Sequence, residues 1–159
     1  MKLERWQIVS FGFGLLLVIA AAVILLRDRE PAGTSLLFPD DAAVVALGRE
    51  VYDAHCASCH GAELEGQPNW RARRPDGLLP APPHDASGHT WHHPGRWLIE
   101  MTKYGPQAFA GPDYRSEMPA FDGILSDAEI VAVLSFIKST WPPEIRRRHD
   151  DLEARAAGQ

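Results

Sequence analysis

The sequence predicts an all-helical protein in which a single membrane-spanning helix precedes a small globular domain. Two observations lead to this fold class. A long run near the start of the chain carries no charged side chain, as a transmembrane helix requires. Further along, apolar residues recur at the three- and four-residue spacing of helices, and no βαβ pattern of alternating strands and helices is present. A chain of 159 residues is long enough for one domain with additional segments.

The uncharged run extends from Trp6 to Leu26 and would be about 31 Å long as a helix, at about 1.5 Å per residue, which matches the hydrocarbon core of a bilayer. A cleaved signal peptide is the alternative, but its apolar region spans only about 7–15 residues and ends at small residues. Here further apolar residues follow Ala20–Ala22. We therefore expect residues 6–26 to be an uncleaved anchor, with residues 1–5, which include Lys2 and Arg5, in the cytoplasm.

The rest of the chain is expected to divide into a linker, a domain and a tail. Residues 27–41 read as a short polar linker, and residues 42–143 as a globular domain. Residues 144–159 form a charged tail, which we expect to be either a solvated helix or disordered. The net charge of −5 disfavours binding to nucleic acid, because that function requires a basic surface.

Three helices are predicted within the domain, from apolar spacing and from residues that favour helix ends. The predicted stretches run from Asp41 to Cys56, from Pro94 to Tyr104, and from Ser126 to Pro142. Residues 61–94 and 107–123 are rich in glycine and proline and are expected to be loops. Their prolines reduce the entropy that is lost when such loops become ordered.

The two cysteines of the chain, Cys56 and Cys59, are separated by two residues and are followed directly by His60. This C-x-x-C-H pattern is the attachment site of a c-type haem. Two thiols on one turn can each form a thioether bond to the same porphyrin, and the adjacent imidazole can bind its iron. A redox-active dithiol is an alternative, although it expects a βαβ setting. A zinc site is another, with two further ligands drawn from His84, His89, His92 and His93.

A second iron ligand is expected from a methionine. Met118 stands in a loop that can fold a thioether over the open face of a haem, whereas Met101 falls inside a predicted helix, where core packing is the usual role. A histidine or an open coordination site are the alternatives. On the opposite side, we expect a backbone carbonyl within Pro80–Pro83 to accept a hydrogen bond from His60, because metal-bound histidines usually have such a partner.

Four histidines gather around Trp91 in the proline-rich loop, namely His84, His89, His92 and His93. Two interpretations of this cluster remain open. Imidazole ligands suit copper or zinc, so the cluster could hold a second metal. Alternatively, these residues lie at the haem edge and form hydrogen bonds with a propionate or with water.

Together these motifs resemble the class I c-type cytochromes from about Ala42 to Trp141. The resemblance rests on three segments, Cys56–His60, Met118–Phe121 and the helix that begins at Ser126. It implies an all-α fold of three to five helices around one covalently bound haem c.

The resemblance also implies particular roles for residues of this chain. The thioether bonds would form at Cys56 and Cys59, and the axial ligands of the haem iron would be His60 and Met118. Two residues of the first helix would cross the terminal helix near Val133 and Phe136, and these are Gly48 and Tyr52.

The expected function is that of a membrane-anchored mono-haem electron carrier. It would transfer single electrons between respiratory or photosynthetic redox proteins at the periplasmic face of a bacterial inner membrane, with the lipid bilayer as a further partner. One alternative is a haem-bearing subunit of a larger membrane oxidoreductase. A haem enzyme or sensor with an open sixth site is another, and copper handling by the histidine cluster is a third.

Overall fold

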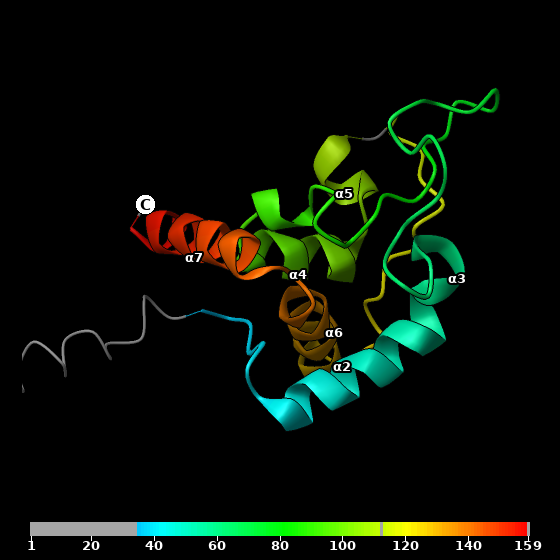
Figure 1. The fold of residues 1–159 in the computed structure, drawn as a ribbon. Coiled ribbons are helices and arrows are strands. Elements are labelled where there is room, and N and C mark those ends of the chain that lie inside the picture. The colour runs from blue at the N-terminus through cyan, green and yellow to red at the C-terminus, as the bar shows by residue number, and fades with distance from the viewer. Residues whose placement is uncertain (1–34, 112, 159) are drawn as a thin grey trace, which may run out of the picture. The chain divides into compact units, whose positions relative to one another are not determined.

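The computed structural model describes residues 35–158 apart from residue 112, and this part of the chain contains helices and no strand. The segments expected at residues 1–5 and 6–26 and most of the linker lie outside the described residues. No helix within the described part is long and apolar enough to cross a bilayer. The helices follow one another in the order shown in Figure 1, namely α2 (Ala42–His55), α3 (Ala57–His60), η1 (Thr90–His92), α4 (Gly95–Tyr104), α5 (Gln107–Ala110), α6 (Asp127–Ser139) and α7 (Pro143–Ala157).

The three predicted helices are confirmed, and they correspond to α2, α4 and α6. The side chain of Asp41 caps α2 by accepting hydrogen bonds from the backbone amides of Ala43 and Val44. At the start of α6, Ser126 and Glu129 form the reciprocal hydrogen bonds of a capping box. The predicted loops differ from the expectation only in containing the short helices η1 and α5.

Helices α2 and α6 cross in close contact at Gly48 (Figure 1). A methyl group on Gly48 would lie 2.0 Å from the carbonyl oxygen of Ala132 and 2.8 Å from Cβ of Phe136. One turn further along α2, the Tyr52 ring packs on Phe136 with 5.5 Å between ring centroids. The crossing expected from the resemblance is therefore present, with Ala132 rather than Val133 facing the glycine.

The apolar core lies around this crossing. Its members come from α2, α4, α6 and α7, from the segment before α2, and from the segments that follow α3, α5 and α6. The core residues with the smallest exposed fractions are Leu37, Tyr52, Ile130, Ala132, Val133, Ile137 and Trp141. Leu37 falls in the segment expected to be a polar linker, yet only 2 % of it is exposed. The backbone amide of Phe38 donates to Ser135 Oγ at 2.9 Å, so the end of this segment is packed on the domain.

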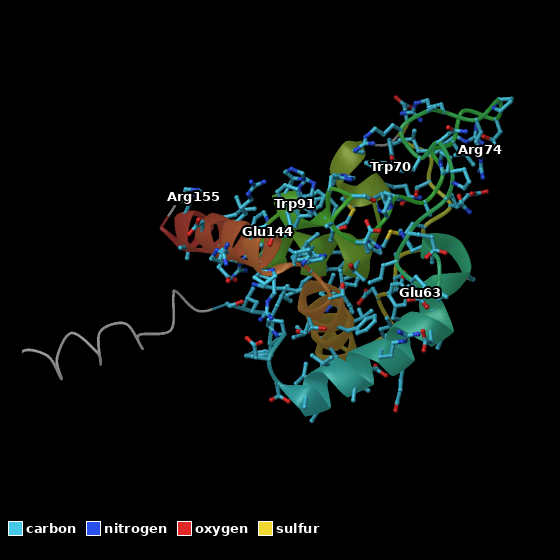
Figure 2. The ribbon with its side chains drawn as sticks, viewed as in Figure 1. Glu63, Trp70, Arg74, Trp91, Glu144 and Arg155 are labelled. Atoms are coloured by element: carbon cyan, nitrogen blue, oxygen red, sulfur yellow. The ribbon has the colours of Figure 1, made fainter. Side chains whose placement is uncertain are left out.

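The loop at residues 61–94 runs without a regular element as far as η1, and Figure 2 shows Trp70 and Arg74 along it. Backbone hydrogen bonds nevertheless connect its distant parts. The amide of Gln67 donates to the Ala81 carbonyl at 2.8 Å, and its side-chain Oε1 accepts from the Ala81 amide at 2.9 Å. These paired contacts hold the loop closed on itself.

The described part of the charged tail forms helix α7, which confirms the helical alternative. One stripe of this helix is buried rather than solvated, and its members recur every four residues, as Ile145, His149 and Glu153. Sequence reasoning missed this stripe because two of its three residues are polar.

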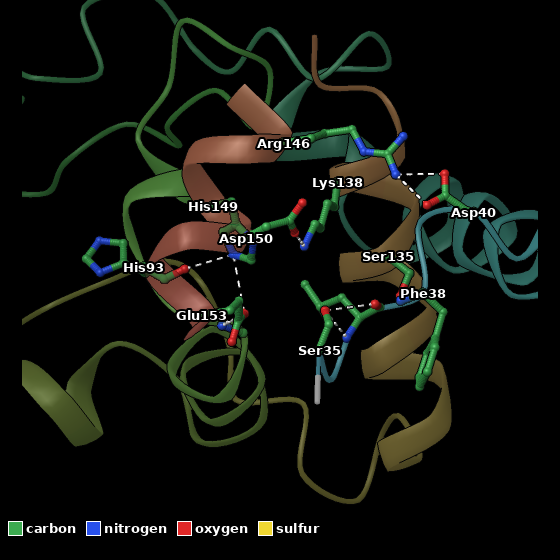
Figure 3. A network of polar contacts seen from close by, with 12 residues as sticks. Ser35, Phe38, Asp40, His93, Ser135, Lys138, Arg146, His149, Asp150 and Glu153 are labelled. Atoms are coloured by element: carbon green, nitrogen blue, oxygen red, sulfur yellow. Dashed lines mark hydrogen bonds and ion pairs between the residues drawn. The ribbon is translucent and has the colours of Figure 1, made fainter. Parts of the chain in front are cut away.

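Polar contacts hold α7 against the domain, as Figure 3 shows. His149 Nε2 lies 3.1 Å from the backbone oxygen of His93, and the Glu153 carboxylate accepts a hydrogen bond from the Gly95 amide, the first residue of α4. In α6, Lys138 Nζ forms an ion pair with Asp150 at 2.6 Å. The tail is thereby connected to η1, α4 and α6.

Candidate haem site

The two cysteines lie at the junction of α2 and α3. Cys56 ends α2, where its amide donates to the Tyr52 carbonyl at 2.9 Å, and it also begins the single turn of α3 that carries Cys59. Residues three apart on one helical turn are neighbours on the helix surface, so both thiols are placed to bond one flat group. Cys59 is exposed, Cys56 is partly buried, and neither forms a disulfide.

The dithiol alternative lacks the βαβ setting in which such a pair is usually found, because the described residues contain helices and no strand. Burial, with a smaller contribution from Cys59, raises the pKa of the Cys56 thiol to about 11. For the zinc alternative, the described residues contain no group of three or more histidine, cysteine or acidic side chains that could hold a metal ion.

His60 is the buried residue of α3, with 8 % of its surface exposed. Its Nδ1 lies 2.8 Å from the backbone oxygen of Pro82. Because a carbonyl can only accept, Nδ1 carries the proton and donates it to this hydrogen bond. This contact confirms the predicted carbonyl partner and places it at Pro82.

The same contact leaves the other ring nitrogen of His60 available. Nε2 then bears a lone pair, and it has no hydrogen-bond partner among residues 35–158 as described. Burial lowers the pKa of His60, while the hydrogen bond to Pro82 opposes this shift. A neutral imidazole with its Nδ1 proton engaged and its Nε2 free is the form that binds iron.

The histidine cluster does not converge on one point. His84 stacks on His60, with 4.1 Å between ring centroids and 25° between ring planes. Each of the other histidines stacks on a different tryptophan, His89 on Trp70, His92 on Trp91 and His93 on Trp97. Sequence reasoning had grouped the four histidines because they are close in the chain, and it missed the contact of His84 with His60.

Met118 is partly buried and packs against the apolar core. Residues on both sides of it in the chain contact other parts of the domain. Its neighbour Glu117 forms an ion pair with Arg74 of the long loop at 2.8 Å. Three residues after Met118, the Phe121 ring packs on the ring of His55, with 6.3 Å between centroids. His55 directly precedes Cys56 in the chain. The alternative ligand Met101 lies within α4.

The site has the features of a protein that carries a covalently bound haem. Two thiols sit on one helical turn, and the histidine that follows them is neutral, with a free Nε2. A methionine-bearing loop is packed beside the last turn of the helix that leads to these thiols. The residues present therefore fit a haem, in an all-α domain.

The comparisons with known proteins agree with this class. The chain belongs to the cytochrome c family, whose profile matches residues 45–141. Cytochrome c-555 of Prosthecochloris aestuarii is 37% identical over 67 residues, which cover 38% of this chain and 68% of that protein. No solved structure gives a significant match. The protein is thus a cytochrome c electron carrier, with a C-x-x-C-H haem-binding motif at Cys56–His60.

Proposed function

We propose that this protein is a membrane-anchored cytochrome c with one haem, and that it carries single electrons between redox proteins at the periplasmic face of a bacterial inner membrane. The electron-transfer role is supported chiefly by the state of the His60 ring. Its Nδ1 donates a hydrogen bond to the Pro82 carbonyl, and its Nε2 is free to bind iron. The membrane anchoring is supported by the uncharged run from Trp6 to Leu26.

Each residue of the site has a defined task in this proposal. Cys56 and Cys59 hold the haem through thioether bonds, while His60 Nε2 and Met118 Sδ take the two axial positions of its iron. When bound, the haem supplies an iron that gains and loses one electron. A thioether ligand favours the reduced form and raises the reduction potential. With both axial positions filled by side chains, small molecules are kept from the metal, and the protein transfers electrons without transforming a substrate.

Partners of this carrier are redox proteins that dock transiently. Complexes of this kind bury little surface, below about 1,200 Å² in total. A small contact area keeps the binding weak, so the two proteins can separate quickly after the electron has been transferred. An anchor confines the carrier to the membrane plane and so raises its effective concentration near membrane-bound donors and acceptors.

Replacing Met118 by alanine tests the axial assignment. The variant is expected to lose the weak red absorption band of sulfur-ligated ferric haem, to have a lower reduction potential, and to bind carbon monoxide rapidly when reduced. Met101→Ala is the matched control and should leave all three properties unchanged. The haem should also stay with the denatured polypeptide during extraction with acidified acetone, since thioether bonds survive it.

Two outcomes would contradict the axial and covalent assignments. Rapid carbon monoxide binding by the reduced wild-type protein would mean that the sixth position is open. Haem that passes into the solvent would mean that the cysteines do not hold it.

The anchor is tested by fractionation of cells that express the full chain. The protein is expected in the membrane fraction and should be released by mild detergent but not by high salt. A variant in which a cleavable export signal replaces residues 1–30 should be found in the soluble periplasmic fraction with its haem attached. A mature wild-type chain that begins directly after Ala20–Ala22 would instead identify the segment as a signal peptide.

A further inference from the structure

We propose that His84 is a positioning residue for the axial histidine, fixing the orientation of the His60 ring and thereby adjusting the reduction potential. This inference rests on the proposed role of His60 as an iron ligand. It starts from the stack between the two imidazoles, whose centroids are 4.1 Å apart with 25° between the ring planes.

A single hydrogen bond does not determine the orientation of the His60 ring. The contact from Nδ1 to the Pro82 carbonyl, 2.8 Å long, restrains one ring atom, but hydrogen-bond angles are broad enough to allow a range of rotations about the Cβ–Cγ bond. A flat side chain against the ring face removes that freedom, because any rotation would bring the rings into collision. His84 supplies this second restraint.

His84 is itself held from three directions. Its Nδ1 lies 2.8 Å from Thr90 Oγ1 at the start of η1. Its backbone amide donates to the Leu64 carbonyl at 2.8 Å, and its backbone carbonyl accepts from Trp141 Nε1 at 2.8 Å. The ring is therefore held by η1, and the backbone of His84 is held by the segment after α3 and by Trp141, which follows α6.

The orientation and the electronic environment of an axial imidazole both affect the reduction potential of the iron. Ring orientation sets the overlap between the imidazole π-orbitals and the iron, and hydrogen bonding and packing around ligands tune potentials in metal sites. An aromatic face also interacts favourably with the positive charge that an oxidised iron would place on its ligand.

The test compares the full-length holoprotein with His84→Leu, His84→Phe and His89→Leu by electron paramagnetic resonance and redox titration. We expect His84→Leu to broaden the low-spin ferric signal, because the His60 ring takes a range of orientations, and to shift the reduction potential upward. His84→Phe keeps a flat face and should give a narrow, wild-type-like signal. His89→Leu removes a histidine that stacks on Trp70 instead, so it should change neither quantity.

Thr90→Val provides a second route if His84→Leu does not mature with haem. It removes the hydroxyl that holds His84 without altering a residue that touches His60. It should also broaden the low-spin ferric signal, as His84→Leu does. The inference is overturned if the signal width and the potential of His84→Leu, or of Thr90→Val in its place, equal those of the wild type. The absence of a low-spin ferric signal in the wild type would instead refute the axial ligation of the proposed function.

Discussion

Replacing Gly48 by alanine is expected to lower the free energy of unfolding by about 1–2 kcal/mol. The added methyl group would lie 2.0 Å from the carbonyl oxygen of Ala132, which belongs to the backbone of α6 and cannot rotate away. Overpacking of this kind costs about 1–3 kcal/mol and occasionally more. The better helix propensity of alanine returns only about 1 kcal/mol, so the clash dominates.

Denaturant unfolding followed by circular dichroism measures this loss. Gly158→Ala is the matched control, because its added methyl would find no atom closer than 3.8 Å, and it should change the unfolding free energy by less than about 0.5 kcal/mol. If Gly48→Ala were as stable as the wild type, or more stable, the two helices could not cross at this position.

His149 is expected to make the protein sensitive to acid. It is 0 % exposed, and its Nε2 must carry a proton because it faces the His93 carbonyl at 3.1 Å. Its Nδ1 is then unprotonated, and this buried atom has no hydrogen-bond partner in the described structure. Protonation would place a charge there, near the Lys138 ammonium.

These surroundings lower the pKa of His149 to about 4, with burial as the main cause and Lys138 as the second. Asp150 and the His93 carbonyl oppose the shift, and the Glu153 carboxylate lies 3.6 Å from Nε2. In the unfolded chain the pKa has its ordinary value of 6.5. As the pH falls below about 6.5, the unfolded state therefore binds a proton that the folded state does not accept until about pH 4.

The folded state should lose up to about 3 kcal/mol of stability across this pH interval. The measurement is the free energy of unfolding between pH 7 and pH 4 for the wild type and for His149→Gln, whose amide can still donate to the His93 carbonyl. The difference between the two proteins isolates the contribution of His149, because every other group is the same in both. Parallel pH curves for the two proteins would contradict the prediction.

The haem motif could be predicted from the sequence because the residues that would bind the haem are close together in the chain. Cys56, Cys59 and His60 lie within five residues, and the helical turn that presents them is local. The hydrogen-bond partner of His60 could be predicted to within four residues, since a metal-bound imidazole requires an acceptor and the prolines mark the loop that can supply it. Met118 remains a prediction as the second iron ligand.

Two features could not be predicted from sequence patterns. The role of His84 depends on how the long loop folds back from Leu64 to Trp141, whereas its neighbours in the chain suggested a cluster with the other histidines. The buried face of α7 was hidden because His149 and Glu153 are polar, and apolar periodicity does not detect polar residues that are buried with partners.

The sequence alone determined helices α2, α4 and α6, the capped starts of α2 and α6, the haem-binding motif and the family resemblance, because each depends on residues close together in the chain. Only the tertiary structure decided what faces Gly48, which carbonyl meets His60 and which ring covers it. Those contacts join residues from different parts of the chain, and packing selects them only when all the elements are in place.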